Sequence, residues 1–145
     1  MHTVSFEEIA EYKHSGVVER LERTTTLSKA QAEELFEDTK KFVYLCAKHP
    51  EVSIPTQALD EGWHNFILFT KDYADFCERF LGRFVHHSPT SPKNAVPARQ
   101  IAAHKQMLGI AAAEFRSPLS ANWTASSPTC CSSEDGGTTN CQDPK

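Results

Sequence analysis

The sequence lacks several features that mark whole classes of protein. No run of roughly 18 apolar residues occurs among its 145 residues, so we expect no membrane-spanning segment. Its 15 basic and 19 acidic residues give a formal net charge of −4, without the basic excess that nucleic-acid binding requires. It also contains no nucleophile elbow, phosphate-binding loop or dinucleotide-binding fingerprint. We therefore expect no nucleic-acid or membrane partner, and the sequence leaves open whether the chain is an enzyme.

Cysteine is present in an odd number and without the spacing of a stable zinc site. The five cysteines include no Cys-x-x-Cys pair, and disulfide bonds are not expected. Residues 1–12 contain three glutamates and no long apolar stretch, unlike a secretory signal peptide. We therefore expect a cytoplasmic protein whose thiols are reduced.

The hydrophobic pattern predicts an all-α fold. Between residues 29 and 48 apolar side chains recur at spacings of three and four, and Ser28 with Gln31 has the spacing of a capping box. The polar side of this long helix is expected to consist of Glu33, Glu34, Glu37, Lys40 and Lys41. Two shorter helices precede it, and later helices are expected over residues 56–69, 70–81 and 98–115. No segment alternates with period two, so we predict a small bundle of five to six helices.

Three glycines have predicted roles. Gly16 is placed to end a first helix that opens at a capping box of Ser5 and Glu8. Gly82 stands where a left-handed residue would end a later helix. Gly62 lies inside a predicted helix, where glycine costs about 1 kcal/mol relative to alanine. Because such a cost usually reflects the close approach of another backbone or a ligand, Gly62 is expected to mark a contact of that kind.

The composition changes at Ser117. Residues 117–145 are rich in Ser, Thr, Pro and Gly and hold few large apolar side chains, so they cannot bury enough surface to offset the entropy lost on ordering. We predict a helical domain over residues 1–116 followed by a flexible, disordered Ser/Thr/Cys-rich tail. Leu119 and Trp123 are the exceptions and could dock back onto the domain. A soft metal or a mixed disulfide could engage the tail thiols, which are Cys130, Cys131 and Cys141.

Residues 59–87 carry the side chains with the most evident chemistry. Asp60 and His64 are four positions apart on a predicted helix, so their side chains project from the same face. Two further histidines follow Gly82, beyond which the chain can fold back. Carboxylate, imidazole and thiolate are the ligands of divalent transition metals. We therefore predict a Zn²⁺ or Fe²⁺ site with the ligands Asp60, His64, His86, His87 and Cys77, supported by Gly62, Trp63 and Tyr73.

Two other interpretations of this chain remain open. Cys77 lies on an apolar stripe with Tyr73 and Phe76, which favours a buried, unreactive thiol. Asp60 can hydrogen-bond His64 and fix its tautomer without a metal. The chain would then be a protein-interaction module with a buried Asp–His network and an unidentified protein partner. The other hypothesis makes the domain a recognition handle whose Cys-rich tail is the substrate of a peptide-modifying enzyme.

The combined motif resembles a known family. It runs Pro55-x-x-x-Leu59-Asp60-x-x-Trp63-His64, then Tyr73-x-x-x-Cys77, Gly82 and His86-His87. This pattern is similar to the helical repeat of the glycine-rich domain-containing proteins of plants and fungi, a domain of unknown function, and to small uncharacterised bacterial proteins. The plant form has a second histidine where this chain has Phe66. The resemblance implies a helical fold in which one cluster contains Asp60, Trp63, His64, Tyr73, Cys77 and His86.

Overall fold

The computed structural model of the chain describes residues 4–52, 54–87 and 97–124. Within these ranges the chain forms six α-helices and no strand, so the predicted all-α class is confirmed. The α-helices are α1 (Phe6–Ala10), α2 (Ser15–Thr24), α3 (Lys29–Lys48), α4 (Gln57–Ile67), α5 (Thr70–Phe76) and α6 (Pro97–Phe115). The shorter turns are the 3₁₀ helices η1 (Pro50–Val52) and η4 (Ala121–Trp123) and the π-helix η2 (Cys77–Leu81). None of these helices is both long and apolar enough to cross a lipid bilayer.

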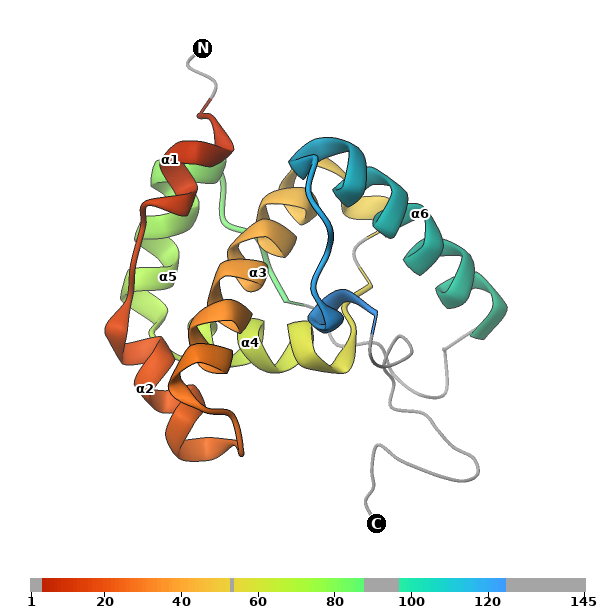
Figure 1. The fold of residues 1–145 in the computed structure, drawn as a ribbon. Coiled ribbons are helices and arrows are strands. Elements are labelled where there is room, and N and C mark those ends of the chain that lie inside the picture. The colour runs from red at the N-terminus through yellow and green to blue at the C-terminus, as the bar shows by residue number, and fades with distance from the viewer. Residues whose placement is uncertain (1–3, 53, 88–96, 125–145) are drawn as a thin grey trace.

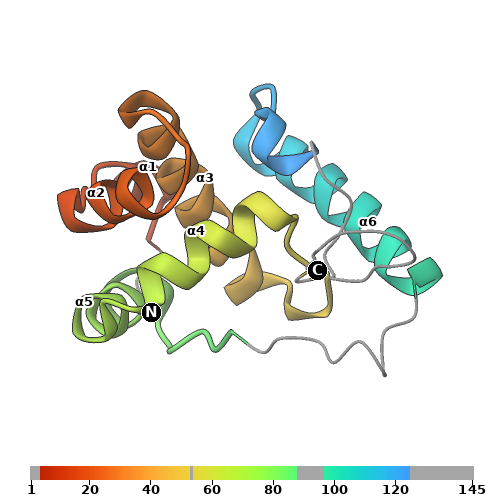
Figure 2. The ribbon, with the colours of Figure 1, turned by 90° about the horizontal axis from the view of Figure 1, so that it is seen from below.

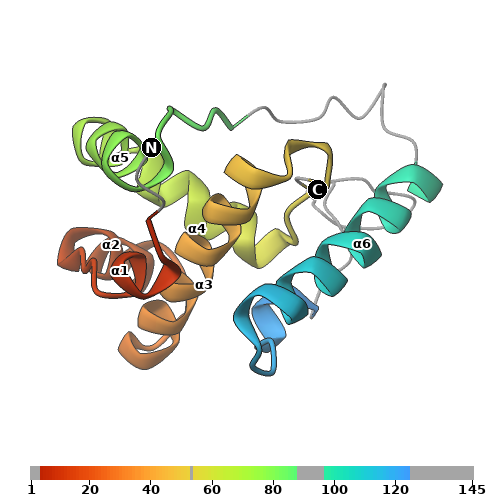
Figure 3. The same ribbon diagram turned by 90° about the horizontal axis from the view of Figure 1, so that it is seen from above.

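Helix α3 occupies the centre of the domain (Figure 1). It packs against α1, α2 and α4, and α5 in turn packs against α4. Seen from below, α2 and α6 lie on opposite sides of α3 while α4 crosses it (Figure 2), and the view from above shows the same arrangement (Figure 3). The core is therefore built around α3, whose largest buried apolar side chains are Leu35, Phe36, Phe42, Val43, Tyr44 and Leu45.

Two helices begin at the predicted capping boxes, and a third begins at a threonine cap. Ser28 Oγ accepts a hydrogen bond from the backbone N–H of Gln31, and the Gln31 side chain accepts one from the backbone N–H of Ser28. Helix α3 therefore begins as predicted. The predicted capping box at the start of α1 also forms. Thr56 caps α4 by accepting from Leu59 N–H at 3.1 Å. Local sequence signals thus set where these three helices begin.

Gly16 does not end α1, so that prediction is wrong. Helix α1 stops at Ala10, and Gly16 lies in the first turn of α2. There His14 Nδ1 accepts a hydrogen bond from Val17 N–H at 3.1 Å and caps the new helix. A Cβ on Gly16 would lie 2.9 Å from His14 Cε1 and 3.0 Å from Phe69 Cε2. The close packing of these two rings therefore requires the glycine.

Lys40 is buried, although the sequence predicts it on the polar side of α3. Its side chain is fully inaccessible, and Nζ donates to the carbonyl oxygens of Ile9, Ala10 and Tyr12 at 3.2, 3.1 and 2.6 Å. The last carbonyls of a helix have no partner within it, so Lys40 completes the C-terminal end of α1. Burial lowers the pKa of Lys40, and the ion pair with Glu37 at 3.0 Å opposes that shift.

The packed body continues to residue 124, beyond the predicted domain end at residue 116. Trp123 in η4 is 1% exposed and meets Phe42, with ring centroids 6.2 Å apart. Leu119 is partly buried against the same core. The expected docking of these two apolar residues is therefore confirmed. The rest of the predicted tail, with its three thiols, lies outside the described residues.

Polar contacts fix η4 to three helices. Ser120 Oγ and Asn122 Nδ2 donate to the buried Asp38 Oδ2 on α3 at 2.6 and 2.9 Å. Thr56, the cap of α4, donates from Oγ1 to the carbonyl of Asn122 at 2.6 Å. On α6, His104 Nε2 contacts the carbonyl oxygen of Trp123 at 2.9 Å. These contacts make η4 part of the folded domain.

The predicted helix over residues 70–81 changes form along its length. It is α-helical to Phe76 and continues as the π-helix η2 to Leu81. Gly82 follows with a φ of 80°, which confirms the predicted left-handed cap. The chain then runs without helix through the returning segment (residues 83–87), in which Val85 is buried.

Candidate functional site

His87 and Asp60 form a short polar contact. His87 Nε2 lies 2.6 Å from Asp60 Oδ1, in the first turn of α4. The His87 side chain is 16% exposed and that of Asp60 is 41% exposed, so the pair sits at the edge of the core. The imidazole also meets the Trp63 ring edge-on, with centroids 4.5 Å apart. Two of the predicted ligands therefore meet, and their contact ties the returning segment to α4.

Trp63, Tyr73 and Val85 form a buried hydrogen-bond chain beside this pair. Trp63 Nε1 donates to Tyr73 Oη at 3.0 Å, and Tyr73 Oη donates to the carbonyl of Val85 at 2.5 Å. Tyr73 is fully buried, and this burial raises the pKa of its hydroxyl well above the ordinary value. Because the phenol stays protonated, it keeps its donor for Val85. The hydrogen-bond chain therefore holds the returning segment against α5.

Cys77 is a packed thiol at the junction of α5 and η2. It is fully buried and is not in a disulfide. Burial raises the pKa of Cys77, and hydrogen bonds with the Val85 backbone and the Tyr73 side chain oppose part of that shift. The thiolate, rather than the thiol, is the form that binds metals and attacks electrophiles. Cys77 is therefore a buried packing residue next to the hydrogen-bond chain.

His64 and His86 are exposed. Neither side chain makes a hydrogen bond or an ion pair with any residue that the structure describes. The His86 ring packs against Phe84, with centroids 4.6 Å apart. Asp60 thus pairs with His87 instead of His64, because the returning segment delivers His87 to α4 while His64 stays on the exposed side of that helix.

The predicted metal ligands do not gather at one point among the described residues. No group of three or more His, Cys, Asp or Glu side chains there is arranged to hold a metal ion. Asp60 and His87 are in contact, whereas Cys77 is buried and the other two histidines are exposed. Zinc sites use three or four protein ligands. A Zn²⁺ or Fe²⁺ site at Asp60 and His87 would need further ligands, and it stays a prediction.

Gly62 marks a close approach between α4 and α3. A Cβ at this position would fall 2.1 Å from Thr39 Oγ1 and 3.2 Å from Leu35 Cγ. Thr39 is itself held in place, since its hydroxyl donates to the Leu35 carbonyl at 2.7 Å. The predicted close contact is present, and the neighbour is a side chain of α3 rather than a backbone. Gly62 therefore supports the site by letting α4 lie close to α3.

His14 and Asp72 form a second His–carboxylate pair, which the sequence pattern does not reveal. His14 Nε2 lies 2.7 Å from Asp72 Oδ2 on α5. Because Nδ1 accepts from Val17 N–H, the neutral ring carries its proton on Nε2 and donates it to Asp72. The one available signal is that His14 directly precedes α2. Helix caps are usually Ser, Thr, Asp or Asn, so this position alone does not predict the role.

A groove with a volume of about 600 Å³ lies between α2 and α3, and we refer to it as the α2–α3 groove. Val18 and Phe36 contribute its apolar lining. Its acidic lining consists of Glu19, Glu22, Glu33, Glu34 and Glu37. The groove therefore combines an apolar wall with a rim that carries an excess of negative charge.

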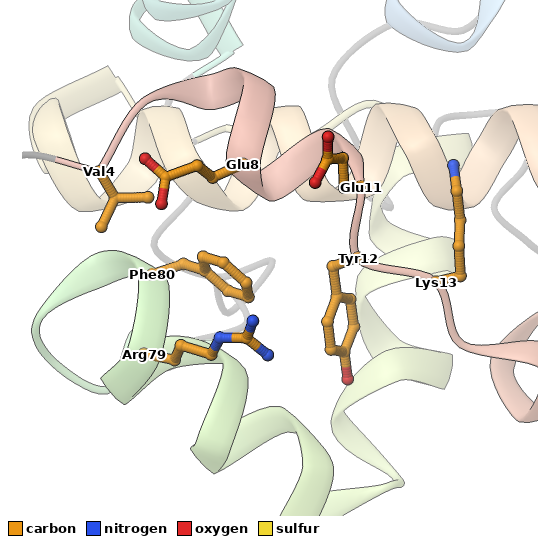
Figure 4. Close-up of a pocket in the computed structure, with 7 residues that line it drawn as sticks. All are labelled: Val4, Glu8, Glu11, Tyr12, Lys13, Arg79 and Phe80. Atoms are coloured by element: carbon orange, nitrogen blue, oxygen red, sulfur yellow. The ribbon is translucent and has the colours of Figure 1, made fainter.

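A second pocket, of about 480 Å³, lies between α1 and η2 (Figure 4). Figure 4 shows Glu8 on α1 and Glu11 just after it across from Arg79 and Phe80, with Tyr12 and Lys13 beside them. The Arg79 guanidinium lies 4.6 Å from the centre of the Phe80 ring. Acidic and basic side chains are balanced in this α1–η2 pocket, so its charge favours neither a cationic nor an anionic ligand.

The part of the chain that matches a protein family contains most of the features described above. No curated protein and no solved structure matches the chain. A family model, UCP032817-like, matches residues 6–109, from the first residue of α1 into α6. That region contains the Asp60–His87 pair, the hydrogen-bond chain and both helices of the α2–α3 groove. Because the match spans more than half of the sequence, the chain belongs to the UCP032817-like family, which is uncharacterised.

Proposed function

We propose that this domain is a protein-interaction module that holds a segment of a partner polypeptide in the α2–α3 groove. The observation that carries the proposal is the groove itself, with a volume of about 600 Å³, an apolar wall formed by the half-buried Val18 and the buried Phe36, and a polar rim. Grooves between packed helices accept the apolar face of a bound peptide, while a polar rim sets its orientation. Polypeptide binding is therefore the function that this surface supports best.

We assign the Asp60–His87 pair a structural role in this function. Together with the buried hydrogen-bond chain, it holds the returning segment against α4 and α5. Arg20 Nε donates to Asn65 Oδ1 at 2.8 Å and ties α2 to α4, while Gly62 lets α4 lie close to α3. These contacts fix the two walls of the groove relative to each other. A rigid surface loses less entropy when a partner binds.

Site-specific photo-cross-linking in cells of the source organism tests this function. A benzophenone amino acid replaces Glu33 or Glu34 in the groove or, as a matched control, the exposed Lys71 on α5. We expect irradiation to give a discrete polypeptide adduct from the two groove positions and none from Lys71. Mass spectrometry of the adduct then identifies the partner.

Two outcomes would contradict the proposal. Equal adducts from all three positions would indicate collisions without a defined binding surface. No polypeptide adduct from Glu33 or Glu34, in variants that circular dichroism shows to be folded, would overturn the assignment of the groove as a protein-binding site.

A further inference from the structure

We infer that the segment held in the α2–α3 groove is a short amphipathic helix with lysines or arginines along its polar side. This partner chemistry rests on the proposed function. It follows from the length of the groove, its apolar wall and its excess of unpaired carboxylates.

The groove runs along one face of each helix. The residues that line it on α2 are Ser15, Val18, Glu19 and Glu22. The residues that line it on α3 are Lys29, Glu33, Glu34, Phe36 and Glu37. From Ser15 to Glu22 the helix axis rises by about 10 Å, which is about two helical turns. A partner helix of two to three turns therefore matches the groove, with apolar side chains spaced three and four residues apart.

The rim carries carboxylates without partners. Among the described residues, no hydrogen bond or ion pair is made by the side chains of Glu19, Glu22, Glu33 or Glu34. Glu37 is different, because Lys13 and Lys40 lie 3.1 and 3.0 Å from its carboxylate. Lys29 offsets one of the four unpaired charges. Charge complementarity therefore favours a cationic partner.

The spacing of the acidic residues strengthens this argument. Glu19 and Glu22 are three positions apart on α2, a separation at which like charges repel and destabilise a helix. A lysine or arginine of a bound segment would relieve that repulsion. Glu19 and Glu22 therefore place two like charges close together on the α2 side of the groove, where a cationic side chain of a partner can pair with them.

Because the groove also has an apolar wall, it favours a partner that is amphipathic rather than merely basic. Phe36 is itself only 1% exposed, so the apolar surface that a partner can cover is that of the half-buried Val18. A basic chain without apolar residues would leave it open to water. The α1–η2 pocket supplies the contrast, because Lys13 and Arg79 there balance the charges of Glu8 and Glu11.

Fluorescence anisotropy on the full-length protein tests the inference with a designed probe. The probe is a labelled peptide of about 18 residues with leucines on one helical face and lysines on the other, long enough to fold on binding. One control peptide replaces each lysine by glutamate, and another has a scrambled order that destroys the apolar face. We expect saturable binding that weakens about tenfold as salt rises from about 50 to about 300 mM, with both controls at least about tenfold weaker.

A pair of double variants assigns the binding to a surface. Glu19→Gln with Glu33→Gln removes two groove charges, and Glu11→Gln with Glu78→Gln removes two exposed charges outside the groove. Glutamine keeps the side-chain length and the helix propensity, so both variants should fold, which circular dichroism checks. We expect the groove variant to weaken probe binding by about 3- to 10-fold and the control variant to change it by less than about twofold.

The outcomes separate this inference from the proposed function. Failure of the Lys/Leu probe to bind, or equal weakening by the two double variants, would overturn the inference. If Glu33 and Glu34 still gave a polypeptide adduct on cross-linking, the interaction module would stand and the basic-helix partner would be wrong. If they gave none, both would fall.

Discussion

His87 Nε2 and Asp60 Oδ1 lie 2.6 Å apart, although 27 positions separate these residues in the chain. The contact joins the returning segment to the first turn of α4, and the edge-on packing of His87 against Trp63 accompanies it. A pair that links distant parts of the chain can serve the fold without taking part in any reaction. Its contribution to stability is therefore the first quantity to measure.

The Asp60–His87 pair should contribute measurably to folding. We expect His87→Ala to lower the free energy of unfolding by about 1–2 kcal/mol, because a hydrogen bond and the packing against Trp63 are both lost. A double-mutant cycle with Asp60→Asn should give a coupling of about 0.5–1 kcal/mol in urea denaturation. The exposed His86→Ala is the control and should change stability by less than about 0.5 kcal/mol. Zero coupling would show that the pair does not support the fold.

Metal content distinguishes a structural pair from the predicted Zn²⁺ or Fe²⁺ site. If the contact between Asp60 and His87 is only structural, His87→Ala should leave the zinc and iron content of the purified, untagged protein unchanged. Its melting temperature should be the same with and without EDTA. Elemental analysis and paired thermal melts measure both quantities. One equivalent of metal in the wild type, lost in His87→Ala, would establish the metal site instead.

Gly62→Ala should destabilise the domain by about 1–3 kcal/mol, although alanine is the better helix former. The added Cβ would meet Thr39 Oγ1 at 2.1 Å and push α4 away from α3. Thr39→Ala should restore part of the loss in the double variant, because it removes the obstructing hydroxyl. Gly109→Ala is the matched control on α6, where nothing lies within 4 Å, and it should stabilise by up to about 1 kcal/mol. Equal effects at the two glycines in urea denaturation would refute the close-contact explanation.

Lys40→Met should lower the free energy of unfolding by about 2–4 kcal/mol. The variant keeps most of the buried volume but leaves the carbonyls of Ile9, Ala10 and Tyr12 without their donor. Lys41→Met, on a neighbouring position that is half-exposed, is the control and should cost less than about 1 kcal/mol. Similar losses for the two variants would mean that the bonds from Lys40 add nothing.

The contribution of Lys40 should also depend on pH. Burial lowers its pKa below the ordinary value of 10.5, so between the two pKa values the unfolded chain binds more protons here than the folded chain. The difference in stability between wild type and Lys40→Met should therefore be constant below the lowered pKa and increase as the pH rises towards 10.5. Urea denaturation of both proteins across this alkaline range measures the difference, and a decrease with rising pH would contradict the lowered pKa.

Truncation after residue 116 should destabilise the domain by about 3–5 kcal/mol relative to truncation after residue 124, because it removes the buried Trp123. Trp123→Phe should cost less, since the indole Nε1 has no hydrogen-bond partner among the described residues and most ring packing is kept. Thermal and urea unfolding of the two truncated chains provide the comparison. Equal stability would show that η4 adds nothing to the core.

The helices could be predicted because their signals are local. The capping box at Ser28 and the apolar spacing that follows it define α3 without reference to the rest of the chain. Gly82 also acts through its own backbone conformation. Lys40 could not be placed in this way, because its partners lie 28 to 31 positions away. The long apolar stem of Lys40 crosses the core and brings its ammonium group to these carbonyls. The spacing of apolar residues along a helix does not predict such a path.

The candidate site was predictable as a set of residues but not as a geometry. Asp60 and His87 belong to the predicted ligand set, and they do meet. Which histidine reaches Asp60 depends on the path of the chain after Gly82, and no local rule gives that path. The α2–α3 groove likewise requires the packing of two helices, although its acidic residues on α3 already belonged to the predicted polar side. His14 escaped prediction because its acceptor, Asp72, is 58 positions away.

Helix α1 has five residues, fewer than a helix needs to persist by itself in water. Its final carbonyls are occupied by an ammonium group that the middle of α3 supplies. The N-terminal helix is thus conditional on the centre of the domain, and it can neither assemble before α3 exists nor unravel alone while that lysine stays in place. Loss of the first helix and loss of the core should then be one cooperative event rather than gradual fraying from the end of the chain.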